Sequence, residues 1–344
     1  FGNSEGYLER MIKRARHVEV QVLGDKFGSI YHLYERDCSV QRRNQKVVER
    51  APAPYLSAAQ RAHICALGKK ICAHVNYECA GTVEFLMDMD SEEFYFIEVN
   101  PRVQVEHTVT EEVTGIDIVR AQILISEGKS LAEATGTDSQ EDVKLDGHAI
   151  QCRVTTEDPS NNFIPDYGRI TAYRGATGMG IRLDGGTAYS GAVITRYYDS
   201  LLEKVTAWAP TPEAAIARMD RALREFRIRG VSTNIAFVEN LLKHPTFLNY
   251  GYTTSFIDTT PELFKFSKRR DRATKILTYI ADITVNGHPE TEGRIKPTQH
   301  IKAPKAPVSI LDNLALPSGT KNILDQKGPQ AVAEWMKAQT KLLI

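Results

Sequence analysis

The chain has 344 residues, of which 42% are hydrophobic and 25% charged, a composition typical of ordinary soluble proteins with two or three domains. Its 43 Lys and Arg residues equal its 43 Asp and Glu residues, which argues against nucleic acid or an anionic membrane as a partner. No apolar run approaches the roughly 20 residues of a transmembrane helix, and five cysteines without a C-x-x-C pair indicate a reducing compartment rather than a disulfide framework or a zinc site.

The first predicted elements are two strands, residues 16–25 and 29–37, joined by a turn that contains two glycines. Side chains alternate between the two faces of a strand. Three polar side chains therefore share one face of the first strand: His17, Glu19 and Gln21.

A polar run, residues 41–46, follows these strands and holds three cations and three amides in six positions. It is either a solvated loop or a loop that faces phosphate, because Arg and Lys in fixed positions suit phosphate recognition. The residues alone leave both interpretations open. A capping box over residues 57–60 then predicts a helix that runs to about residue 74.

Two strand-like runs, residues 81–88 and 94–100, are separated by a polar connector of hairpin length. A hairpin centred on Ser91 gives three facing pairs: Leu86 with Phe96, Glu84 with Glu98, and Thr82 with Asn100. Glu84, Glu98 and Asn100 then offer three oxygens to a hard divalent ion such as Mg²⁺. A register shifted by one residue would instead turn one carboxylate to solvent.

The segment 98–106 leaves the second run with polar residues at every second position. Pro101 favours an extended backbone at the residue before it. In an extended chain five polar side chains share one face: Glu98, Asn100, Arg102, Gln104 and Glu106. We expect this face to be a reaction surface, with a solvated surface strand as the alternative.

Beyond this segment, a helix is predicted over residues 111–126 and a polar boundary over residues 136–142. The next elements read as an α+β unit: strands at 147–155, 169–173, 180–183 and 201–207, and helices from 211 and at 234–242. A linker at 293–317 and a terminal helix at 329–343 are predicted beyond this unit.

Residues 1–260 resemble the biotin carboxylase component of biotin-dependent carboxylases. The similarity is carried by residues 17–19, 35–49 and 82–85 and by the run Asn100-x-Arg102-x-Gln104-Val105-Glu106-His107. Residues 265–288 and 319–336 resemble the linker that joins biotin carboxylase to carboxyltransferase in single-chain pyruvate carboxylases.

The resemblance implies an α+β fold that is the C-terminal half of an ATP-grasp fold, followed by the biotin carboxylase C-terminal domain and a linker or allosteric region. We place these three parts at residues 1–145, 146–262 and 263–344. The implied reaction is ATP- and bicarbonate-dependent carboxylation of biotin N1′ through carboxyphosphate, which supplies the carboxyl group that converts pyruvate to oxaloacetate. The alternatives are a subunit of an acyl-CoA carboxylase, which the tail disfavours, and a non-catalytic regulatory or assembly module that binds acetyl-CoA.

The same resemblance assigns site residues. Glu84, Glu98 and Asn100 match the ligands of Mg²⁺ (or Mn²⁺). The positions that match contacts to ATP are Glu9, Ile12, His17, Gln41, Asn44 and Leu86. Glu9 to Ile12 correspond to the hinge beside adenine, and Asn44 stands where histidine is usual, so it can donate a hydrogen bond but carries no charge. Lys46, Arg102, Gln104 and the backbone of Val105 match the bicarbonate site. Glu106 matches the general base, and Arg153 matches the arginine that stabilises the biotin enolate.

The resemblance also implies partners: the biotin-carrying and carboxyltransferase domains, a homotetramer, and acetyl-CoA as activator. Arg227, with Arg229 near it, and Arg272 in a basic run are candidates for the CoA phosphates, with a solvated helix face as the alternative. The expected location is the cytoplasm of a bacterium or the mitochondrial matrix of a eukaryote.

The sequence begins at Phe1 without an initiator methionine or a signal peptide, so we expect a removed N-terminus or a piece of a longer polypeptide. The ATP-binding lysines and the glycine-rich phosphate loop of the family have no counterpart in these residues, nor does the biotin-bearing Met-Lys segment. We therefore expect the 344 residues alone not to hydrolyse ATP at a significant rate.

Overall fold

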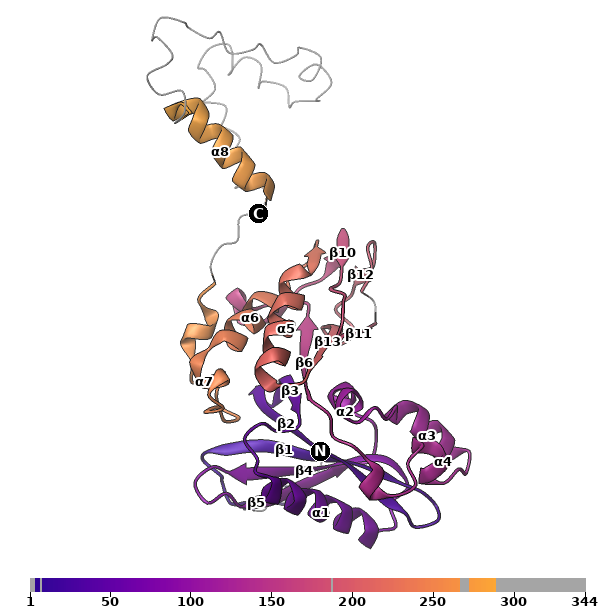
Figure 1. Ribbon diagram of the computed structural model, residues 1–344. Coiled ribbons are helices and arrows are strands. Elements are labelled where there is room, and N and C mark those ends of the chain that lie inside the picture. The colour runs from indigo at the N-terminus through magenta and orange to yellow at the C-terminus, as the bar shows by residue number, and fades with distance from the viewer. Residues whose placement is uncertain (1–3, 7, 187, 267–271, 289–344) are drawn as a thin grey trace, which may run out of the picture. The chain divides into compact units, whose positions relative to one another are not determined.

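The computed structural model describes residues 4–6, 8–186, 188–266 and 272–288 (Figure 1). The chain divides into two compact units, Phe1–Ser267 and Lys268–Ile344. The described part of the second unit contains the helix α8, Arg272–Asn286. The predicted linker at 293–317 and the predicted helix at 329–343 lie outside the described residues.

An eight-stranded antiparallel sheet forms the centre of the first unit, in the order β11-β13-β6-β3-β2-β1-β4-β5. Its strands are β1 Ala15–Gly24, β2 Ile30–Arg42, β3 Gln45–Ala51, β4 Cys79–Asp88, β5 Phe94–Asn100, β6 His148–Thr155, β11 Ile181–Gly185 and β13 Leu201–Ala209. Because β3 pairs with β6, the sheet runs across the predicted domain boundary at residue 145. The division into domains at that residue stays a prediction.

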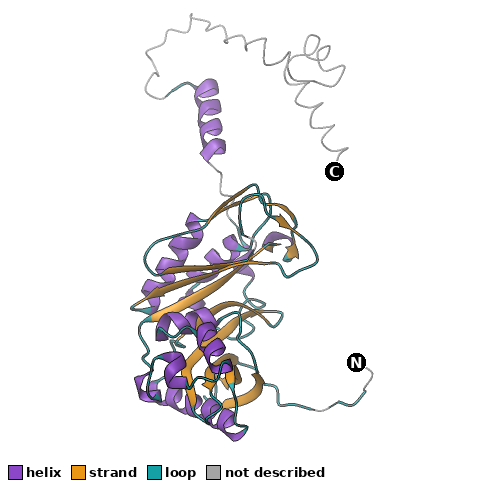
Figure 2. Ribbon diagram, turned by 90° about the vertical axis from the view of Figure 1, so that its right-hand side faces the viewer, coloured by secondary structure: helices purple, strands orange, loops and turns teal. Residues whose placement is uncertain are grey.

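Helices pack along this sheet, as Figure 2 shows by colour. They are α1 Ala58–His74, α2 His107–Thr114, α3 Ile118–Ser126, α4 Leu131–Thr135, α5 Pro212–Glu225, α6 Ile235–Lys243 and α7 Pro245–Leu248. Short strands complete the unit: β7 Glu157–Asp158, β8 Ile164–Pro165, β9 Gly168–Arg169, β10 Ala172–Arg174, β12 Val193–Ile194 and β14 Arg227–Arg229. Short 3-10 helices are η1 Gln140–Asp142, η2 Pro159–Asn161 and η3 Pro261–Phe264. Among the described helices, none has the length and apolar character that crossing a membrane requires.

The alternation of β1 separates the core from the polar face. Val18, Val20 and Val22 pack in one apolar cluster with residues of α1, such as Ile64. The side chains between these valines point to the opposite face of the sheet. The prediction that the polar residues of β1 share one face is therefore confirmed. Helix α2 partly covers this polar face.

Several predicted elements are confirmed. Helix α1 begins at the capping box of Ser57 and Gln60, and α5 begins with Thr211 as N-cap and Pro212 in its first turn. The single helix predicted over residues 111–126 is wrong. Gly115 adopts the left-handed conformation (φ 72°) and ends α2, and Asp117 caps the separate helix α3.

The predicted hairpin register is correct at its functional end and wrong at its tip. Glu84 pairs with Glu98 and Thr82 with Asn100. A bulge between Glu84 and Phe85 then shifts the ladder, so Leu86 faces Tyr95 instead of Phe96. One extra residue in one strand produces this shift, and an alternation count cannot detect it.

The extended polar face predicted over residues 98–106 does not persist. Strand β5 ends at Asn100, and Glu106 is already the N-cap of α2. Pro101 lacks the N–H that would continue the ladder, and the Arg102 N–H donates to the Asn100 carbonyl (2.9 Å) in a tight turn. The turn nevertheless directs the same five side chains, together with Val105, into one cavity.

Candidate active site

A polar cavity of about 820 Å³ opens on the face of the sheet opposite α1. It gathers most of the predicted site residues: His17, Asn44, Lys46, Glu84, Glu98, Asn100, Arg102, Gln104, Val105, Glu106 and Arg153. They come from β1, β3, β4, β5 and β6, from the turn between β2 and β3, and from the turn before α2. Residues far apart in the sequence therefore converge because their strands are neighbours in one sheet.

Lys46 is the centre of the charge arrangement. Its Nζ donates to Glu19 Oε2 (2.5 Å), Glu106 Oε1 (2.6 Å) and Glu84 Oε1 (3.0 Å). Burial alone would lower the pKa of this ammonium, but the surrounding carboxylates outweigh burial and hold the pKa well above its usual value. Lys46 therefore stays cationic at any physiological pH.

Arg36 lies beneath Lys46 with no exposed side-chain surface. Its Nε donates to Glu19 Oε1 (2.6 Å), and its other nitrogens donate to Gln21, Thr110, Thr82 and Gln104. Burial raises the pKa of Glu19, but the charges of Arg36 and Lys46 outweigh it and bring the value to about 2. A buried charge is tolerated only when its partners are present, so these groups form a fixed floor beneath the cavity.

Glu106 is held between two cations. One carboxylate oxygen accepts from Lys46, and the other accepts from the Arg153 guanidinium (3.0 Å). Arg153 Nε donates in turn to the buried Glu49 (2.6 Å), whose pKa is raised by burial and lowered less by the charge of Arg153. This arrangement fixes the direction of the Glu106 carboxylate, which is what a proton acceptor requires.

Glu84, Glu98 and Asn100 form a candidate cation seat. The Asn100 Nδ2 donates to Glu84 Oε1 and to Glu98 Oε1, at 3.1 Å each. Two carboxylate oxygens therefore converge on the Asn100 amide nitrogen from facing strands, while Asn100 Oδ1 accepts from Arg102 (3.3 Å). The two carboxylates, with room for substrate oxygens, fit a hard divalent cation such as Mg²⁺, and a turn of the Asn100 amide would add a third oxygen.

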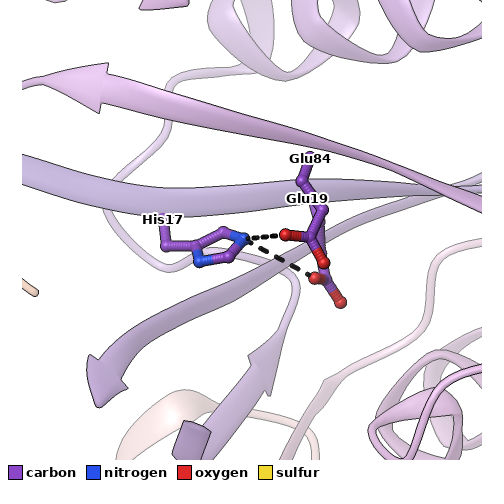
Figure 3. Close-up of side chains that lie close together, drawn as sticks. All are labelled: His17, Glu19 and Glu84. Carbon is purple, nitrogen blue, oxygen red and sulfur yellow. Dashed lines mark ion pairs between the residues drawn. The ribbon is translucent and has the colours of Figure 1, made fainter. Parts of the chain in front are cut away.

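A second acidic grouping lies beside this seat. The His17 Nε2 is 3.0 Å from Glu84 Oε2 and 3.9 Å from Glu19 Oε2 (Figure 3). Its ring is held from the other side by Gln41, whose Nε2 is 2.7 Å from Nδ1. Glu19 is fully buried and contacts both Arg36 and Lys46, whereas Glu98 is exposed and its carboxylate contacts Asn100, so the pair Glu84 and Glu98 offers the better place for a divalent cation.

Arg102 differs from the other cations of the cavity. It is exposed, and its nitrogens contact Asn100 Oδ1 (3.3 Å) and the Val103 carbonyl (3.4 Å). Among the residues that the structure describes, no carboxylate pairs with it. Its charge is therefore directed to the cavity without an internal partner, as an anion-binding group requires.

Some predicted residues do not line this cavity. Glu9 and Ile12 lie in a segment before β1, and Leu86 faces Tyr95 in the β4–β5 hairpin. Gln41 reaches the cavity only through His17. Arg227 is exposed on β14, and Arg272 begins α8.

The sequence did not identify the roles of Glu19, Arg36 and Glu49, whose side chains are fully buried. The available signal was the triplet Glu35-Arg36-Asp37 inside a predicted strand. Charged residues in a central strand are almost never buried unless they are paired, so this triplet pointed to partners on neighbouring strands.

Two family models match the chain. One, described as "Carbamoyl-phosphate synthase L chain, ATP binding domain", matches residues 1–134. The other, described as "Biotin carboxylase C-terminal domain", matches residues 151–259. The pyruvate carboxylase of Bacillus subtilis (strain 168) is 54% identical over 100% of this chain and 30% of its own length. The chain thus spans about 30% of the length of the curated relatives that it matches.

Solved structures agree with these matches. Pyruvate carboxylase of Rhizobium etli, solved with the allosteric activator acetyl coenzyme A, has a TM-score of 0.77 and 63% identity, covering 97% of this chain and 33% of its own. The biotin carboxylase domain of the Hydrogenobacter thermophilus 2-oxoglutarate carboxylase, solved as a dimer with MgADP and bicarbonate, has a TM-score of 0.72 and 43% identity. That alignment covers 76% of this chain and 56% of the other.

Proposed function

We propose that this chain, which belongs to the biotin-dependent carboxylases, activates bicarbonate with ATP and carboxylates biotin. It contains the ATP-grasp and C-terminal parts of a biotin carboxylase. The predicted family and fold are confirmed by the matches along the whole chain. The observation that carries the proposal is the carboxylate of Glu106, which Lys46 and Arg153 hold in the cavity that also contains the cation seat.

Bicarbonate would bind at Lys46, Arg102, Gln104 and the backbone of Val105. The exposed, unpaired guanidinium of Arg102 supports this assignment, as does the bicarbonate in the Hydrogenobacter thermophilus relative. Fixed cations at this place would hold the anion beside Glu106. Binding in a fixed orientation supplies much of the rate in a reaction between two bound species.

Glu106 would take the proton of bicarbonate, and a bicarbonate oxygen would attack the γ-phosphorus of ATP. The bond to the ADP oxygen breaks, and carboxyphosphate and ADP form. Carboxyphosphate then separates into CO₂ and phosphate, phosphate accepts the N1′ proton of biotin, and the N1′ nitrogen attacks CO₂. Arg153 would stabilise the negative ureido oxygen during this step by its fixed charge.

Glu84, Glu98 and Asn100 would hold Mg²⁺ or Mn²⁺, which supplies charge neutralisation for the phosphate oxygens of ATP when it is bound. The nucleotide itself would contact His17, Gln41, Asn44 and Leu86, with adenine beside the backbone of Glu9 to Ile12. Biotin would arrive on a carrier segment. The carboxyl acceptor would be pyruvate, since the relatives that match over the whole chain are pyruvate carboxylases.

Cleavage of ATP that depends on bicarbonate tests this function in the full-length protein. Glu106→Gln removes the proton acceptor and keeps the shape, so the rate is expected to fall at least about 100-fold. Glu127→Gln, an exposed glutamate at the end of α3, is the matched control and is expected to keep the wild-type rate. A rate of ATP cleavage that does not depend on bicarbonate, or that is unchanged in Glu106→Gln, would contradict the proposal.

Acetyl-CoA activation is a second candidate function of the same chain. Arg227 on β14 directly faces Arg174 on β10, and both side chains are exposed. Like charges that face each other across two strands repel, so an anion such as a CoA phosphate would stabilise the pair. Arg272 is the further candidate, and the solved Rhizobium etli relative supports an activator of this class.

We further propose that the full-length protein is a homotetramer with biotin-carrying and carboxyltransferase domains, in the bacterial cytoplasm or the mitochondrial matrix. Activation is tested by the acetyl-CoA concentration that gives half-maximal stimulation. Arg227→Ala and Arg272→Ala are each expected to raise it about tenfold, because each removes one charge-assisted contact to phosphate. Unchanged activation in both variants would rule out these arginines.

A further inference from the structure

The start of helix α2 lacks the usual cap. Glu106 occupies the N-cap position, but its side chain makes no capping hydrogen bond. Its two oxygens are engaged by Lys46 and Arg153 instead. A carboxylate that serves the site cannot also fix the first turn of the helix, so other contacts must hold that turn in place.

The next residue, His107, supplies such a contact. Its imidazole is buried between two charged groups, with Nε2 3.1 Å from Lys204 Nζ and Nδ1 3.1 Å from Glu111 Oε1. An ammonium can only donate a hydrogen bond. Nε2 must therefore accept from Lys204, so Nδ1 carries the hydrogen and faces the Glu111 carboxylate as a close electrostatic contact rather than an aligned hydrogen bond.

The two cations that contact Glu106 and His107 lie opposite each other on neighbouring strands. Arg153 on β6 and Lys204 on β13 are direct partners across the ladder. Two consecutive residues of the chain are thus fastened to two facing residues of neighbouring strands. A rotation of the first turn of α2 that moved Glu106 away from Arg153 would also have to break the contact between His107 and Lys204.

Glu111 anchors the far side of the imidazole. Its Oε1 accepts from the backbone N–H of Ile118 (2.8 Å), and its Oε2 accepts from Arg182 (2.7 Å). Burial raises the pKa of this carboxyl, but the contacts to His107 and Arg182 outweigh burial and lower it. Glu111 therefore stays ionised, and its charge attracts the hydrogen that Nδ1 carries.

We propose that His107 is a positioning residue for the reaction: it fixes the first turn of α2 between Lys204 and Glu111, and so keeps the Glu106 carboxylate between Lys46 and Arg153. This inference rests on the proposed function, in which Glu106 is the base. Thr108 also fixes this turn of α2, because its Oγ1 contacts Gln151 (2.5 Å) and Thr206 (2.8 Å). Loss of His107 alone should therefore weaken the reaction and not abolish it.

The test measures bicarbonate-dependent ATP cleavage and MgATP binding in the full-length protein. For His107→Ala, kcat is expected to fall roughly ten- to 100-fold, the effect of a small misplacement of a reacting group, with the Kd for MgATP within twofold of wild type. In His107→Asn, the amide nitrogen takes the place of Nδ1 and can still present a hydrogen to the Glu111 carboxylate. This variant is expected to recover at least a third of the lost kcat on a logarithmic scale.

Two further variants keep the test decisive. Lys204→Met removes the donor to His107 and is expected to lower kcat at least threefold, which decides the matter if His107→Ala does not fold. His74→Ala, an exposed histidine in the last turn of α1, is the matched control. A kcat within twofold of wild type in both His107→Ala and Lys204→Met would overturn the proposal, as would a His107→Asn variant no better than His107→Ala.

The result for Glu106→Gln distinguishes failure of the positioning role from failure of the proposed function. If Glu106→Gln loses activity while the His107 and Lys204 variants keep it, only the positioning role fails. If Glu106→Gln itself keeps activity, the proposed function fails, and the role of His107 fails with it.

Discussion

The floor and the rim of the cavity differ in how their charges are balanced. On the floor, Glu19 and Arg36 have no exposed side-chain surface, and their oxygens and nitrogens are engaged by protein groups. On the rim, Glu98 and Arg102 are exposed, and Asn100 is their hydrogen-bond partner. The floor is complete without ligands, whereas the rim offers a carboxylate and a guanidinium that only a cation and an anion would balance.

This difference separates stability from binding. Charges on the floor act on the fold, because breaking a buried pair leaves an uncompensated charge. Charges on the rim act on ligands, because exposed ion pairs contribute little to folding. The comparison predicts that substitutions on the floor change the free energy of unfolding, while substitutions on the rim change ligand dependence at constant stability.

The largest effect is expected for Glu19→Gln. The variant leaves the buried Arg36 guanidinium without its carboxylate, which should lower the free energy of unfolding by about 3–5 kcal/mol. Urea unfolding measures this loss. Glu98→Gln on the rim should change stability by less than about 0.5 kcal/mol, and equal losses in the two variants would remove the distinction between floor and rim.

The pH dependence of stability gives a second comparison. The pKa of Glu19 is about 2 in the fold against an ordinary 4.5, and that of Glu84 is also lowered. Both contributions are therefore fully present above pH 4.5 and are lost as the pH falls toward 2. For Glu19 the loss is on the order of 3 kcal/mol. Unfolding followed from pH 6 to pH 2 should show a flatter profile in Glu19→Gln, and an unchanged slope would contradict the pairing.

Arg102→Gln should act on the anion and not on the fold. Removal of one fixed donor from a site of developing charge costs roughly 100-fold, so kcat/KM for bicarbonate should fall by about that factor. Stability should remain at the wild-type value because the side chain is exposed. Arg120→Gln, an exposed arginine of α3, is the matched control, and an equal loss there would show a general charge effect.

Glu98→Gln should have the smallest effect, on the metal. Loss of one charged oxygen ligand should raise the Mg²⁺ concentration for half-maximal activity roughly tenfold at saturating ATP. Excess Mg²⁺ should restore the rate. A variant that Mg²⁺ cannot restore would indicate that Glu98 acts in some way other than holding the cation.

The sequence predicted the parts of this site that depend on local periodicity. The facing of Glu84 and Glu98 follows from a short hairpin, and the capping box located α1. The motif around Glu106 led to the family, but its extended conformation was wrong, because a turn at Pro101 and the start of α2 replace the strand. The side chains still meet, since the turn and the strand end open on the same cavity.

The buried charge contacts could not be predicted in the same way. Arg36 pairs with Glu19 across the β1–β2 hairpin, whose ladder contains a bulge between Val20 and Val22, and Arg153 meets Glu106 because α2 lies over β6. Such pairs depend on the register of a hairpin and on how a helix crosses the sheet. Charge periodicity within one segment contains no information on either, although the triplet around Arg36 signalled that partners were needed.

Transfer of labelled carbon from bicarbonate to free biotin tests the central claim most directly. With the full-length protein, ATP and Mg²⁺, wild type is expected to form acid-labile carboxybiotin, and Glu106→Gln should form it at least about 100-fold more slowly. Absence of ATP-dependent label on biotin in wild type, or a Glu106→Gln rate above one tenth of wild type, would contradict the account.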